Sequence, residues 1–120
     1  MTSDTPRIDL DAAERLRQQG GDELLGSLIE SFLARTPVRI EQAQSFVEAG
    51  DVHRAGEVMH LLGSSCAMLG AVAMQSSCRS GEGHALEDRS DGVAHAVASL
   101  RAEFQRIRPH FERLLVEARR

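Results

Sequence analysis

The sequence predicts an all-α fold: an antiparallel four-helix bundle with a short amino-terminal lid helix, in a single domain over residues 1–120. Apolar residues recur at steps of three and four along most of the chain, and no stretch alternates apolar with polar residues as a half-buried strand would. Glycines and acidic residues interrupt this pattern where helices are expected to end and begin. With 120 residues, 42% of them hydrophobic, the chain is long enough to bury one core.

A pair of glycines separates the first two predicted helices. The pattern DAAE at 11–14 is typical of a capping box and predicts a short helix to about Gln18. The segment GGD at 20–22 ends it and starts a long helix from about Asp22 to Ala49. Pro37 is expected to bend that helix, because proline removes a backbone donor and crowds the preceding turn. The residues expected to face inward are Leu25, Ile29, Phe32, Ile40, Ala43 and Val47.

Three more helices are predicted in the rest of the chain. Asp51 is placed to cap a helix over 52–69, Gly70 predicts a break, and another helix is expected over 71–86. The segment EDRSDG at 87–92 predicts a loop in which Asp91 caps the last helix, and Pro109 predicts a kink further on. The apolar stripe of this helix alternates steps of four and three, as in antiparallel bundles: Val93, Val97, Leu100, Phe104, Ile107, Phe111 and Leu114.

Composition excludes several classes of protein. The formal net charge is −4 and no basic run could follow a phosphate backbone, which argues against nucleic-acid binding. The apolar runs are too short to cross a membrane and the polar, acidic amino terminus does not form a signal peptide, so we expect a cytoplasmic protein. All 14 basic residues are arginine, which excludes a lysine Schiff base or phosphate clamp. Cys66 and Cys78 lie among apolar residues and are expected to be buried.

The segment HLLGSSCAMLGA at 60–71 places a histidine at the head of an apolar stretch of helix. The buried seam of this helix is predicted to be Val52, Ala55, Met59, Leu62, Cys66 and Leu69. At roughly 100° per residue, the face that carries His60 is centred about 130° from that seam, so its imidazole is expected to stand in solvent. The residues that share its face on this projection are His53, Gly56, Glu57, Gly63, Ser64 and Ala67.

Small residues beside His60 have two explanations. Each glycine inside a helix costs about 1 kcal/mol relative to alanine, so Gly56 and Gly63 require a reason. Either strong packing tolerates poor helix formers, or another macromolecule approaches the imidazole and the six residues form its docking surface. An exposed imidazole is nucleophilic near neutral pH and its phosphoramidate can pass a phosphoryl group on, so reversible phosphoryl transfer suits such a site.

Residues 60–71 resemble the central motif of the histidine-containing phosphotransfer (HPt) domain of bacterial multistep phosphorelays. That motif has the form H-x-L-K-G-S-S-x-x-L-G-A, and without a gap His60 takes its phosphoryl position. The other matching residues are Leu62, Ser65, Leu69, Gly70, Ala71, Met74, Cys78 and Glu82. Segments 8–37 and 100–115 look like the first and last helices of the family, so the resemblance covers nearly the whole chain.

The resemblance implies a phosphorelay intermediate with a four-helix bundle fold. His60 would be the phosphorylated residue and would carry the group between aspartates of receiver domains, in a hybrid sensor kinase or a response regulator. No ATP-binding motif is present, so the chain is not expected to phosphorylate itself. No cofactor is expected, because Mg²⁺ and the acid chemistry would belong to the partner receiver domain. A monomer is the default expectation.

One departure from the family concerns the charge beside His60. Gly63 and Ser64 stand where the family usually has lysine and glycine, so the expected face carries no cation. Aligning Gly63 with the family glycine instead would put Met59 at the phosphoryl position and displace the rest of the motif, so the ungapped alignment is preferred. Arg79 is the first candidate to replace the lysine, and a cation of the partner is another.

The sequence is also compatible with functions other than phosphoryl transfer. The main alternative is a helical adaptor that keeps the fold and the docking surface but does not transfer phosphate, which the missing lysine and Glu57 favour. Glu57 and His60 also form an E-x-x-H pair like those of di-iron bundles, yet no second inward pair is found. No serine or cysteine is marked as an activated nucleophile. The histidines expected to be solvated helix-face residues are His53, His84, His95 and His110.

Overall fold

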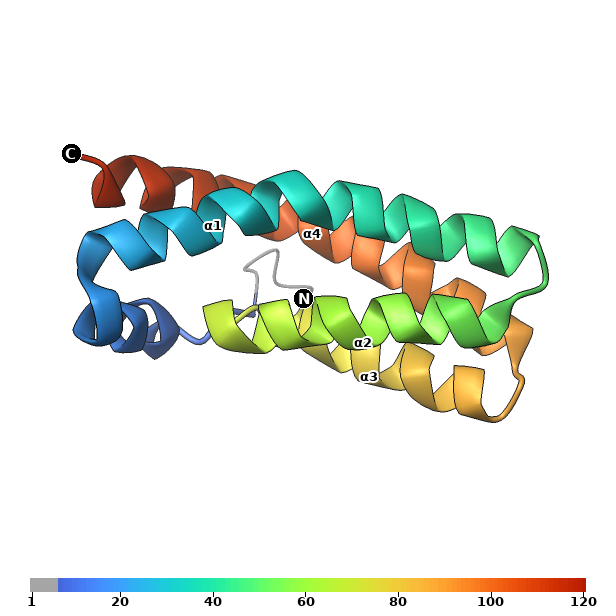
Figure 1. The fold of residues 1–120 in the computed structure, drawn as a ribbon. Helices are drawn as coiled ribbons and strands as arrows, with labels where there is room; N and C mark the ends of the chain where they lie inside the picture. The colour runs from blue at the N-terminus through green and yellow to red at the C-terminus, as the bar shows by residue number, and fades with distance from the viewer. Residues whose placement is uncertain (1–6) are drawn as a thin grey trace, which may run out of the picture.

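The structure, a computed structural model, describes residues 7–120 of the chain. It contains four helices: α1 (Asp11–Glu48), α2 (Val52–Leu69), α3 (Val72–Leu86) and α4 (Ser90–Ala118). Consecutive helices run in opposite directions, and α1 and α4 lie side by side above the α2–α3 pair (Figure 1). The predicted antiparallel four-helix bundle is therefore confirmed. No helix within residues 7–120 is both long and apolar enough to cross a membrane.

The predicted break between the lid helix and the long helix lies inside α1. Gly20 (φ −153°, ψ 17°) and Gly21 (φ 71°, ψ −169°) leave the helical conformation. The positive φ of Gly21 is one that a residue without Cβ adopts at little cost. The short helix before this break turns toward the carboxyl end of α2 (Figure 1), where the Asp9 amide donates to the Gly70 carbonyl at 2.8 Å.

Some predicted helix ends are confirmed and others are wrong. The Asp51 carboxylate caps α2 by accepting from the Arg54 amide at 3.2 Å, and Gly70 ends that helix in the left-handed conformation. By contrast, Asp11 already lies inside α1, and Asp9 accepts a bond from its amide at 3.0 Å. Asp91 lies in the first turn of α4 rather than at its cap, so the loop before it is shorter than predicted. Both aspartates still place negative charge at a helix amino terminus, which explains why they resembled caps.

The predicted inward faces form one continuous core. The predicted seam of α2 is buried throughout, and so is the stripe of α4 from Val93 to Phe111. The Phe32 ring of α1 packs edge-on against the rings of Phe104 and Phe111, with centroids 6.1 and 5.3 Å away. Cys66 and Cys78 are buried free thiols, as predicted. Pro37 and Pro109, each predicted to kink its helix, both lie inside helices that continue past them.

Candidate functional site

His60 lies near the middle of α2, and its side chain is 70% exposed. The imidazole reaches across to α3, where Nδ1 lies 2.9 Å from Oε2 of Glu82. The Glu82 side chain is less exposed, at 30%, and comes from a turn of α3 that packs directly against α2. The predicted exposure of His60 is therefore what the structure shows, and its ring is held on one side.

The bond to Glu82 determines which ring nitrogen is available. An ionised carboxylate can only accept hydrogen bonds, so Nδ1 of His60 carries the proton and donates it to Glu82. In the neutral ring the lone pair then belongs to Nε2. Among residues 7–120 no side chain bonds to Nε2, which leaves this nitrogen as the nucleophilic atom of an exposed ring.

Gly56 and Gly63 are not exposed, contrary to the prediction from the sequence, although each lines a depression beside His60. Both are buried against α3. A Cβ at Gly56 would lie 2.7 Å from Cβ of Ala85, and one at Gly63 would lie 3.2 Å from Cβ of Cys78. The helical projection placed them near His60, but α3 covers that side of α2. Their absence of a side chain therefore serves close helix packing, and this close approach brings His60 within reach of Glu82.

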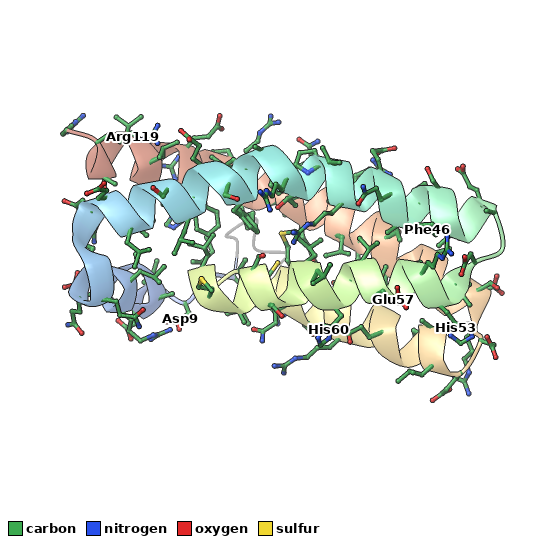
Figure 2. The ribbon with its side chains drawn as sticks, viewed as in Figure 1. Asp9, Phe46, His53, Glu57, His60 and Arg119 are labelled. Atoms are coloured by element: carbon green, nitrogen blue, oxygen red, sulfur yellow. The ribbon has the colours of Figure 1, made fainter. Side chains whose placement is uncertain are left out.

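The other four residues of the predicted docking surface are exposed: His53, Glu57, Ser64 and Ala67. His53, Glu57 and His60 follow one another along α2 (Figure 2). Nε2 of His53 lies 2.8 Å from a carboxylate oxygen of Asp88, and the Ser64 hydroxyl donates to the His60 carbonyl at 3.3 Å. The structure therefore places most, but not all, of the predicted surface around the histidine.

Two depressions meet at His60, one toward each end of α2. The first is an open apolar groove between α2 and α3, and its lining includes Leu61 and Leu86, whose side chains are exposed. The second depression lies toward the carboxyl end of α2 and is lined by His60, Gly63, Ser64, Ala67, Gln75, Arg79 and Glu82. The spacing of Leu61, Leu86 and Gln75 in the sequence does not mark them as site residues. For Glu82, the sequence predicts only a match to the family motif and not a place in the site.

The metal alternative rests on the E-x-x-H pair of Glu57 and His60. No three His, Cys, Asp or Glu side chains converge as metal ligands within residues 7–120. Glu57 and His60 face the groove rather than the bundle core, so the E-x-x-H pair does not point inward as a di-iron site requires.

Two of the remaining histidines differ from the prediction that they are solvated. His84 and His110 are half-buried, whereas His53 and His95 are exposed. The His110 ring packs edge-on against Phe111, with centroids 5.1 Å apart. Burial, together with the nearby Arg113, lowers the pKa of His110. Neither His84 nor His110 lines either of the two depressions that contain His60.

These features define a class of protein: an antiparallel helical bundle in which the exposed imidazole of His60 is oriented by a carboxylate of the next helix. Within that class, the Hpt domain family matches residues 27–110, most of the chain. The chain belongs to this family, and the resemblance seen in residues 60–71 is confirmed.

Solved structures agree with the family assignment. Histidine-containing phosphotransfer protein B (HptB) from Pseudomonas aeruginosa is 20% identical, with a TM-score of 0.86 over 93% of this chain and 96% of that one. ZmHP2, a histidine-containing phosphotransfer protein from maize, is 21% identical, with a TM-score of 0.80 over 92% of this chain and 83% of that one. At such identities the likeness establishes the fold. A comparison with curated protein sequences finds no significant match.

Proposed function

We propose that His60 accepts a phosphoryl group from an aspartyl phosphate of a receiver domain and passes it to an aspartate of another. The observation that carries this proposal is the hydrogen bond between Glu82 and Nδ1 of an exposed His60, because it leaves Nε2 free to react. Membership of the Hpt domain family supports it, and so do the names of the structural relatives, which are histidine-containing phosphotransfer proteins.

The chemistry of the step follows from the orientation of the ring. The Nε2 lone pair attacks phosphorus, and the Nε2–P bond forms as the bond from phosphorus to the aspartate oxygen breaks. The aspartate leaves as a carboxylate with the electron pair of that bond. Because Nδ1 keeps its proton, the phosphorylated ring is an imidazolium whose N–H faces the Glu82 carboxylate. Attack by a second aspartate reverses these changes and returns the electron pair to Nε2.

The receiver domain would cover the exposed residues that surround His60. Glu57, Ser64 and Ala67 offer short or flexible side chains close to the ring, and Leu61 offers apolar area at the edge of the groove. The arrangement suits a partner that closes over the imidazole and excludes water from the transfer. Mg²⁺ would be bound by the receiver domain, and the chain would act as a carrier rather than as a kinase. We expect it to act as a monomer.

An intact-mass spectrum tests this proposal. The purified chain is incubated with a phosphorylated receiver domain, or with phosphoramidate as a small donor. We expect the wild type to gain the mass of one acid-labile phosphoryl group and His60→Gln to gain none. His95→Gln, which removes another exposed histidine outside both depressions that contain His60, is the matched control and should still be labelled.

Two results would contradict the proposal. Labelling of His60→Gln equal to that of the wild type would show that another residue carries the group. A folded wild type that binds a receiver domain but takes up no phosphate from any donor would instead establish the adaptor function.

A further inference from the structure

Phosphorylation of His60 adds negative charge, and this chain lacks the lysine that the family usually places beside the phosphorylated histidine. A phosphoryl group brings about −1.5 to −2 of charge at neutral pH. Glu82 is bonded to the ring at Nδ1 and Glu57 lies on the adjoining groove, so neither carboxylate offers a positive charge to a phosphoryl group on Nε2. The chain contains no lysine at all. A lysine at position 63 would also need room for a Cβ that lies 3.2 Å from Cβ of Cys78.

The neighbouring helix α3 contributes a cation to a depression that contains His60. α2 and α3 are antiparallel, so the residues that precede Glu82 in α3 lie beside those that follow His60 in α2 (Figure 1). Arg79 is one turn before Glu82 and lines the depression that also contains His60 and Gly63. Because Gly63 has no side chain, α3 packs closely against α2 at this point, and the turn of α3 that carries Arg79 lies beside the same depression as His60.

Arg79 is also free to bind an anion. It is exposed, and among residues 7–120 no carboxylate lies within ion-pair distance of it. Several other arginines are paired with carboxylates: Arg15, Arg17, Arg54, Arg89, Arg101, Arg108 and Arg119. Within the described residues, Arg79 is the one arginine that lines either depression containing His60.

We propose that Arg79 binds the phosphoryl oxygens carried by Nε2 of His60 and thereby stabilises the phosphorylated state, which rests on the proposed function of His60. A guanidinium presents N–H groups in a planar fork that matches two phosphate oxygens. The Gln75 amide lies one turn before Arg79, lines the same depression, and supplies a further donor. In this arrangement Glu82 faces the cationic ring, and Arg79 faces the anionic phosphoryl group.

The equilibrium of phosphoryl exchange with a receiver domain tests this assignment. An equilibrium constant does not depend on how fast the partners dock, so it reports the stability of the phosphorylated state itself. For Arg79→Ala we expect the constant to shift toward the phosphorylated receiver by about two- to fivefold, as for an ion pair in partial contact with solvent. Arg79→Lys should recover part of this loss, and Arg79→Gln should not.

Arg108→Ala is the matched control, because it removes one positive charge from α4 without touching either depression. It should leave the exchange equilibrium unchanged, and circular dichroism should show all variants folded. An Arg79→Ala equilibrium equal to that of the wild type would overturn the assignment while leaving the role of His60 intact. A wild type that accepts no phosphoryl group would overturn the proposed function, and the assignment with it.

Discussion

The carboxylate of Glu82 lies 2.9 Å from Nδ1 of His60, and this bond joins α2 to α3 at the point where the site is built. The contact depends on how closely the two helices approach, because an exposed imidazole can reach only a neighbour on the adjoining face. Gly56 and Gly63 permit that approach by leaving space for the side chains of α3. The orientation of His60 is therefore a property of the helix pair and not of the motif in α2 alone.

Glu82→Gln and Glu82→Ala separate the orienting role of Glu82 from its charge. The glutamine carbonyl can still accept from Nδ1, whereas alanine leaves the ring without a partner. We expect ¹⁵N NMR of the imidazole to show one tautomer, protonated at Nδ1, in the wild type and in Glu82→Gln. Glu82→Ala should show a mixture. A single Nδ1-protonated tautomer in Glu82→Ala would mean that Glu82 does not set the orientation.

The stability of the phosphorylated state should respond to the charge as well. Since Glu82→Gln removes the negative charge that faces the phosphorylated imidazolium, the exchange equilibrium with a receiver domain should move against the chain. The expected change is about two- to fivefold, the range of an exposed ion pair. The measurement is the fraction of each protein phosphorylated at equilibrium. An unchanged phosphorylated fraction in Glu82→Gln would show that the charge of Glu82 does not stabilise the phosphorylated state and that the hydrogen bond is sufficient.

Gly56→Ala and Gly83→Ala form a pair that tests whether the glycines serve helix packing. A Cβ at Gly56 would lie 2.7 Å from Cβ of Ala85, whereas one at Gly83 would meet nothing within 4 Å. Both positions are inside helices, where alanine is favoured over glycine by about 0.5–1 kcal/mol. Gly83→Ala should therefore raise the free energy of unfolding by about that amount. Gly56→Ala should lower it by about 1–3 kcal/mol, the usual cost of overpacking.

Urea denaturation of both variants measures this difference. If Gly56→Ala were as stable as Gly83→Ala, the α2–α3 contact would have room that the structure does not show. The small residue would then be better explained by clearance for a partner.

The sequence predicts the fold well and the site in part, for a physical reason that these glycines illustrate. Periodicity reports which side of a helix faces its own core, so the seam from Val52 to Leu69 and the exposure of His60 could both be predicted. It does not report where the next helix crosses. Gly56 and Gly63 lie at the border between the core side and the exposed side, and only the position of α3 decides that they are buried.

The same limit applies to residues that α3 contributes. The bond from Glu82 and the position of Arg79 depend on the distance and relative rotation of two helices, which single-helix patterns do not contain. The match to the family motif singles out Glu82, but it does not indicate which residue Glu82 contacts. Leu61 and Leu86 carried no signal, because an exposed leucine next to a groove has the same spacing as any other surface residue.

The two cysteines should be unreactive in the folded protein. Both are fully buried, and hydrogen bonding with Cys66, together with burial, raises the pKa of the Cys78 thiol. Because the thiolate is the reactive form, a disulfide reagent should label the native protein slowly, at a rate limited by opening of the bundle. In urea, both thiols should react at once. Native labelling as fast as labelling in urea would show that the α2–α3 contact opens readily.

Glu103 should make stability fall as pH rises through the mildly acidic range. The Ser77 hydroxyl lies 3.0 Å from both carboxylate oxygens of Glu103, linking α3 to α4. Burial raises the pKa of Glu103 above its ordinary value, although the Ser77 bond and the nearby Arg7 and Arg106 oppose this shift. Between the unfolded pKa, about 4.3, and the raised folded pKa, the folded state binds more protons than the unfolded state. The contribution of Glu103 is thus fully present below this window and is lost above it.

Glu103→Gln tests the sign of this effect, because its amide oxygen can still accept from Ser77 but does not titrate. The free energy of unfolding of both proteins is measured in urea at about pH 4 and about pH 7. Other titrating groups are common to both proteins and cancel in the difference. The variant should gain stability relative to the wild type between the lower and the higher pH. A relative loss over the same interval would mean that the arginines outweigh burial and that Glu103 stabilises the fold as a carboxylate.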